Sequence, residues 1–341
     1  MPAGSILINS VEVLPMVASE SCSRDAGVRE HTLQANTLEF QRHFGAAAFS
    51  LRHSLAENPL FSLEAMEDAA ASWTKLGNTD RFVVSGGQTR TDAKFSEMVD
   101  KDRICSAIRA LPHSCSYVKI SNINALDANY ERVMQQALLD VERLLGQPIV
   151  PRITWAQMTV FLSSPNIVTP YHIDHEANFL CQIAGEKDVW LFDPNDRELL
   201  PDPEIERFYL GDLNGAQYRE HLQGRGKHFR LVPGIAVHHP PLAPHWVKNG
   251  PNVSISASIN FCMRELDRRA HIYQVNALLR RMGLHPSPPG RSVTGDTVKA
   301  GGMKLLGSSR PKNYRDAVFS GLDRLRAPYK LTRKLLQRSA R

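Results

Sequence analysis

The 341-residue sequence contains no long hydrophobic run, and none approaches the roughly 18 apolar residues that cross a membrane. We therefore expect no membrane contact. An apolar patch lies within residues 1–21, but no basic segment precedes it, and Glu12 and Pro15 interrupt it. Residues 1–30 are accordingly expected to form a flexible or docking N-terminus rather than a signal peptide.

Cysteine is scarce, and its spacing shows no pairs. There are five cysteines, an odd number, and no two of them form a Cys-x-x-Cys pair. Disulfide frameworks and structural zinc modules need paired cysteines, so both classes are disfavoured. The pattern is typical of a protein in the reducing cytoplasm, with each cysteine serving as small core or surface filler.

The body of the chain lacks a strong charge of either sign. The formal net charge is +6, but residues 301–341 contain eleven Lys/Arg and two Asp/Glu. The remaining residues therefore sum to about −3, and the basic character belongs to the tail. We expect this tail to be a solvated extension, or to make weak contact with nucleic acid or an acidic partner.

Hydrophobic periodicity predicts a mostly β protein with flanking helices. Helical patterns occupy 33–76, 129–148 and 270–286, and strand patterns occupy 81–86 and 116–123. Short strands then follow at close spacing, which favours a barrel or a sandwich: 153–162, 178–184, 188–194, 227–233, 235–239 and 252–263. We divide the chain into an N-terminus (1–30), a helical region that packs on the barrel and adds strands to it (31–150), the barrel (151–265), a C-terminal helix (266–290) and a basic tail (291–341). Residues 287–296 are read as a linker.

One stretch, Thr169 to Phe192, holds many polar residues among apolar ones. In it, His172 and Asp174 are two residues apart, so on an extended backbone they point to the same face. A histidine from another strand would complete a set of two histidines and one carboxylate, as in non-haem Fe(II) oxygenases. Alone, such a pair is more often a surface or capping feature. Spacing does not choose the third histidine among His238, His239 and His245.

This stretch resembles the JmjC/cupin-like 2-oxoglutarate oxygenases, the family that includes the asparaginyl hydroxylase of hypoxia-inducible factor. The family pattern is Thr-Pro-x-His-x-Asp, then Asn six residues and Gly-x-Lys fifteen residues after the His; this sequence has Thr169, His172, Asp174, Asn178 and Lys187. The family's distal histidine follows a proline-containing turn and precedes an asparagine by fifteen residues. His245 and Asn260 match this spacing, whereas His238 and His239 have no such asparagine.

The resemblance implies a double-stranded β-helix, or jelly roll, that binds Fe(II), 2-oxoglutarate and O2. It implies His172, Asp174 and His245 as metal ligands and catalytic centre, and the following as cosubstrate-binding residues: Thr169, Lys187, Asn178, Asn260 and Tyr117. The implied reaction is hydroxylation, or demethylation through hydroxylation. The substrate is unidentified, with a protein side chain favoured by analogy. The helix at 270–283 would either close a homodimer, as in some relatives, or cap the barrel.

Two of these residues also fit on physical grounds. 2-Oxoglutarate is a dianion, and a buried lysine such as Lys187, with the Thr169 hydroxyl, suits its far carboxylate; the alternative is an edge-strand lysine that reaches solvent. In the segment before Phe261, Asn260 shares a face with Ser254, Ser256 and Ser258. That face lines a pocket or faces water, and the resemblance favours the pocket.

Two other functions compete with this reading. A cupin-like barrel can act as a regulator or binding module without catalysis, its basic tail docking on nucleic acid. A hydrolase or isomerase using Zn or Mn is a further option, but it would leave the spacing of Lys187 and Asn260 unexplained. Near the pair, His175 and Glu176 are expected at the rim, with His175 as an alternative partner of the metal ligands.

Overall fold

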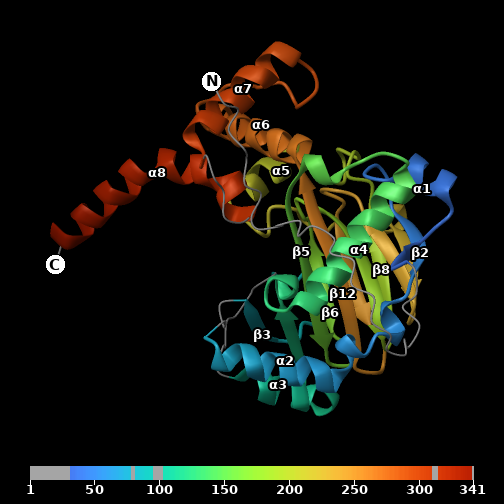
Figure 1. Ribbon diagram of the computed structural model, residues 1–341. Coiled ribbons are helices and arrows are strands. Elements are labelled where there is room, and N and C mark those ends of the chain that lie inside the picture. The colour runs from blue at the N-terminus through green and yellow to red at the C-terminus, as the bar shows by residue number, and fades with distance from the viewer. Residues whose placement is uncertain (1–30, 78–80, 95–102, 309–313, 340–341) are drawn as a thin grey trace, which may run out of the picture.

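The computed structural model describes residues 31–77, 81–94, 103–308 and 314–339. The expected flexible N-terminus, 1–30, lies outside them. Figure 1 shows the strands at the centre of the molecule, with the helices of residues 37–145 packed around them and the helices of residues 202–339 grouped at one end.

The strands form two sheets. Within each sheet, all neighbouring strands of the described residues pair in antiparallel orientation. The large sheet has the order β1 (Leu33–Gln34), β2 (Phe49–His53), β10 (Ile235–His239), β7 (Ala177–Ala184), β12 (Ser254–Met263), β5 (Ile153–Ser163), β4 (Ser116–Ile120) and β3 (Phe82–Gly86). The small sheet has the order β6 (Val168–His172), β11 (His245–Asn249), β8 (Lys187–Leu191) and β9 (Lys227–Leu231). This architecture confirms the expected jelly-roll class with flanking helices, and residues 33–120 do contribute strands to the large sheet.

Helices cover the outer face of the large sheet. They are α1 (Thr37–His43), α2 (Leu63–Lys75), α3 (Ile104–Ala110) and α4 (Ala128–Leu145). Alternate residues of β7 and β12, among them Phe179 and Phe261, pack with α4 in one large core. The other residues of these strands therefore point toward the small sheet. Short 3₁₀ helices connect the elements at Leu55–Glu57, Pro59–Phe61, Leu111–His113, Ile123–Ala125, Val150–Arg152 and Glu220–Arg225.

Helix α4 shows why the sequence predicts it well. The Asp127 side chain accepts a hydrogen bond from the Asn129 N–H at its start, and Gly146 ends it in the left-handed conformation at φ 70°. Between these signals, apolar residues recur at helical spacing and are buried against the sheet. The helix predicted at 129–148 is thus confirmed.

The helical pattern predicted over 33–76 is wrong in its middle. Residues 49–53 form β2, in which Phe49, Leu51 and His53 are buried while Ser50 and Arg52 are exposed. β2 pairs with β10, so the backbone of a locally ambiguous segment is satisfied by a distant strand.

The C-terminal region forms two helices where the sequence predicted a linker and a solvated tail. After α5 (Asp202–Tyr209) and α6 (Arg264–Arg281), the chain forms α7 (Val293–Leu306) and α8 (Tyr314–Ser339). Ser292 caps α7 by accepting from the Gly295 N–H. Val318, Phe319 and Leu322 of α8 are buried with residues of α5, α6 and α7, while the far end of α8 projects from the body (Figure 1). None of the helices in the described ranges is long and apolar enough to cross a membrane.

Candidate functional site

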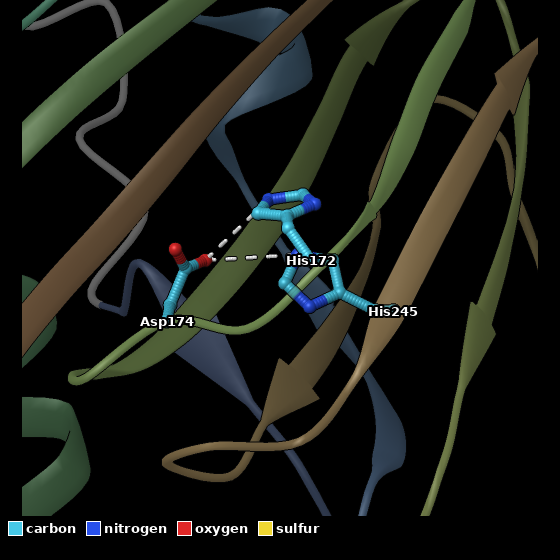
Figure 2. Close-up of side chains that lie close together, drawn as sticks. All are labelled: His172, Asp174 and His245. Carbon is cyan, nitrogen blue, oxygen red and sulfur yellow. Dashed lines mark ion pairs between the residues drawn. The ribbon is translucent and has the colours of Figure 1, made fainter. Parts of the chain in front are cut away.

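The small sheet brings His172, Asp174 and His245 together. His172 ends β6, His245 begins β11, and the two residues are direct partners in the antiparallel register. Asp174 Oδ2 lies 3.9 Å from His172 Nε2 and 3.6 Å from His245 Nε2 (Figure 2). The candidate ligand atoms of the three residues lie within 4.8 Å of one another, a spacing that a single metal ion can bridge.

Backbone carbonyls orient both imidazoles of this His-Asp-His group. His172 Nδ1 lies 2.7 Å from the Pro170 carbonyl oxygen, and His245 Nδ1 lies 3.0 Å from that of Ala243. A hydrogen bond from Nδ1–H to a carbonyl fixes the tautomer that presents the Nε2 lone pair, as in most histidine metal sites. Burial, reinforced by His172, lowers the pKa of His245 to about 4 and keeps the ring neutral.

The two histidines that competed with His245 take other positions. His238 donates from Nδ1 to the Asn178 carbonyl and accepts at Nε2 from the Gly45 N–H, both at 3.0 Å. It therefore ties β10 to its neighbours. His239 is buried near His245, but its nitrogens are not part of the group of candidate ligand atoms.

The His-Asp-His group lies in a cavity of about 590 Å³ between the two sheets. Thr169 and Lys187 line it from the small sheet, and Asn178, Asn260 and Tyr117 line it from the large sheet. The structure thus brings all eight candidate residues predicted from the sequence to one cavity, although they come from six strands and the turn after β6.

Lys187 is a buried lysine in the lining of this cavity. Its side chain is buried at 4% exposure, so it does not reach solvent from a sheet edge. Within the described part of the chain it forms no ion pair, and burial lowers its pKa to about 7. A buried cation without a counter-charge is unfavourable, so the position suits an anionic ligand.

The polar face of β12 points into the fold and not to bulk water. Ser258 and Asn260 line the cavity, and the Ser258 hydroxyl donates to Asn260 Oδ1 at 2.8 Å. Ser256 donates to Gln182 Oε1 at 2.9 Å farther along the strand. Of the two readings of this face, the structure supports the pocket.

His175 and Glu176 differ from the expected rim residues. His175 is fully buried, and its ring nitrogens lie 2.9 Å from the Tyr209 hydroxyl and 3.0 Å from Asp267 Oδ1. It thereby anchors the turn that carries Asp174 to α5 and α6. Glu176 is half-buried and lines the cavity, and burial raises the pKa of its carboxyl group.

One wall of the cavity was not predicted from the sequence. It consists of Phe208, Gly211 and Leu213 at the end of α5 and beyond it, with Arg315 and Phe319 of α8. The Arg315 guanidinium lies 5.7 Å from the centre of the Phe319 ring. The sequence predicts a possible amphipathic helix near Tyr314–Leu325, but not that it borders this site.

Solved structures of YcfD, a ribosomal oxygenase from Escherichia coli, are similar to this chain. The complex with cobalt and 2-oxoglutarate has 14% identity and a TM-score of 0.45, and the match covers 82% of this chain and 73% of that chain. The complex with cobalt and succinic acid has 13% identity and a TM-score of 0.44, with the same coverage.

None of the curated proteins compared with the chain matches it. The profile of the cupin-like domain, by contrast, matches residues 25–276, which is most of the sequence. The match includes the residues of both sheets and the whole His-Asp-His group. The chain therefore belongs to the cupin-like domain family.

Proposed function

We propose that the protein is an Fe(II)- and 2-oxoglutarate-dependent oxygenase that hydroxylates its substrate, or demethylates it through hydroxylation. One observation carries the proposal: a His-Asp-His group shares a cavity with a buried lysine that has no counter-charge among the described residues. Two imidazoles and one carboxylate suit Fe(II) and leave coordination positions open. The lysine suits the far carboxylate of a dianion.

Each cavity residue has a distinct task in this proposal. His172, Asp174 and His245 would hold the iron, with the Pro170 and Ala243 carbonyls fixing the histidine tautomers. Bound Fe(II) supplies the redox chemistry in which O2 and 2-oxoglutarate yield succinate, CO2 and one oxygen atom for a substrate C–H bond.

The remaining residues bind and orient the cosubstrate. Lys187, whose side chain is buried, and the Thr169 hydroxyl would hold its far carboxylate through charge-assisted contacts. The large sheet, on the facing side of the cavity, would supply further polar contacts to 2-oxoglutarate through Asn178, Asn260 and Tyr117.

We further propose a protein side chain as the substrate class, since the oxygenases that the motifs resemble include protein hydroxylases. The cavity wall from α5 and α8 combines apolar side chains with Arg315 and is the place where such a side chain would enter. The four described cysteines are all free, which supports the cytoplasmic location that we propose.

Two measurements test this function. We expect the full-length protein loaded with Mn(II) to bind 2-oxoglutarate in calorimetry, and the Fe(II) form with ascorbate to release succinate slowly even without substrate. If neither binding nor succinate is detected, the oxygenase assignment is wrong. Binding without succinate would favour the regulatory cupin instead.

A further inference from the structure

Strand β10 places two adjacent histidines in different surroundings. His238 has hydrogen-bond partners for both ring nitrogens and is absent from the lining of the cavity. His239 is only 3% exposed and lines the cavity. Among the described residues, neither Nδ1 nor Nε2 of His239 has a hydrogen-bond partner.

A buried imidazole with two unpartnered nitrogens is costly, because it loses its hydrogen bonds to water and gains none from the protein. A histidine ring has at least one N–H donor in either protonation state. No described residue offers a hydrogen-bond partner to the His239 ring, and a ligand in the cavity can supply one.

The position of His239 indicates which ligand this is. Its ring centre lies 4.6 Å from that of His245, and Lys187 lines the same cavity. Its register partner on β7 is Asn178, whose side-chain Oδ1 is likewise buried without a partner. Two residues on adjacent strands, His239 and Asn178, thus carry unpartnered polar atoms and line the cavity that also contains the His-Asp-His group and Lys187.

A direct role on the metal does not fit this geometry. The candidate ligand atoms that lie within 4.8 Å of one another belong to His172, Asp174 and His245, and those of His239 are not among them. A single buried water could satisfy part of the ring, but it would give the side chain no role in binding. The experiment below separates that case.

We propose that His239 binds the cosubstrate directly, by donating its ring N–H to an oxygen of 2-oxoglutarate. This inference rests on the proposed function. His239 then complements Lys187: the lysine supplies charge for one carboxylate, and the imidazole supplies a directed donor from the facing sheet. The two adjacent histidines of β10 therefore have different roles: His238 holds the strands together, and His239 contacts the ligand.

Calorimetry of 2-oxoglutarate binding to the Mn(II)-loaded full-length protein tests the proposal. We expect His239→Leu to weaken 2-oxoglutarate about tenfold or more, since the contact is a hydrogen bond to an anion. Mn(II) affinity should stay within about threefold. His239→Asn or His239→Gln, which place an N–H near Nδ1 or Nε2 respectively, should restore most of the affinity in one of the two cases.

The neighbouring histidine is the matched control. His238→Leu should lower the thermal midpoint while leaving 2-oxoglutarate affinity unchanged; His238→Gln replaces it if the leucine variant does not fold. His239→Leu should keep or raise the midpoint, because it removes an unsatisfied polar group. If His239→Leu binds 2-oxoglutarate as tightly as the wild type, the proposal is wrong. If the wild type binds none, the proposed function itself fails.

Discussion

At the scale of single residues, Lys187 makes cosubstrate binding depend on pH. Burial lowers its pKa to about 7, so above that pH the side chain is largely neutral before the ligand binds. An anionic carboxylate stabilises the charged form and raises the pKa again. At pH 8 we therefore expect proton uptake on 2-oxoglutarate binding, and an affinity that falls as the pH rises above 7. Calorimetry in buffers of different ionisation enthalpy measures this uptake, and identical heats in all buffers would contradict it.

Replacing Lys187 should change the free energy of unfolding and the affinity for 2-oxoglutarate in opposite directions. Between about pH 7 and the ordinary lysine pKa, the unfolded chain holds a proton that the folded chain lacks, so stability rises with pH in this window. Lys187→Met should stabilise the ligand-free protein at pH 8 by up to about 3 kcal/mol. It should also weaken 2-oxoglutarate roughly a hundredfold or more. Urea unfolding and calorimetry measure the two effects, which should have opposite signs.

The spacing of single residues was informative because catalytic groups on strands obey a simple rule. Residues two apart in an extended segment share a face, so His172 and Asp174 could be placed together from the sequence, although Asp174 lies in the turn after β6. The choice of His245 needed the spacing to Asn260 taken from the resembled family. The different surroundings of His238 and His239 could not be predicted, because they depend on which neighbouring strand supplies hydrogen-bond partners.

At the scale of elements, the turn after β6 is held by a buried contact. His175 joins it to Tyr209 of α5 and Asp267 of α6. We expect His175→Ala to lower the free energy of unfolding by about 2 kcal/mol or more, because it leaves buried polar groups unpaired. Metal affinity should fall with it, since Asp174 is adjacent. Tyr209→Phe, which removes one hydroxyl, should show a smaller loss of both; equal metal affinity in all three proteins would show that the turn needs no anchor.

Elements with capping residues and a long apolar periodicity were predictable from the sequence. Short strands that depend on pairing with distant strands were not. Helix α4 has caps and an apolar stripe. β2 was mistaken for a helix because its alternation covers only five residues within a longer helical pattern, and its pairing partner β10 lies far away in the sequence. The short strand β11 was not predicted as a strand at all, yet it carries His245 between β6 and β8.

At the scale of the whole molecule, the C-terminal region belongs to the fold. Leu322 of α8 is buried at 1% exposure, whereas Leu325 on the same helix is 44% exposed. Leu322→Ala should lower the free energy of unfolding by about 2–4 kcal/mol. Leu325→Ala should change it by less than about 0.5 kcal/mol. Thermal and urea unfolding check both, and equal effects would contradict the packing of α8.

This packing changes how a role for the basic tail is tested. Deleting 301–341 would remove buried residues and a cavity wall together with the charges. Charge substitutions that keep α8, such as Arg315→Gln and Arg324→Gln, are therefore the sharper variants for salt-dependent binding to nucleic acid. The sequence predicted the charge and a possible helix there, but a wall of the cavity arises only from tertiary packing.

The most direct test of the central claim is succinate release from 2-oxoglutarate by the Fe(II)-loaded full-length protein. The comparison is between the wild type, His245→Ala and His228→Ala, the last being a partly exposed histidine on β9 that lies outside the cavity lining. We predict oxygen-dependent succinate from the wild type and His228→Ala, and none above background from His245→Ala. Equal succinate from His245→Ala, or none from the wild type, would contradict an oxygenase built on this His-Asp-His group.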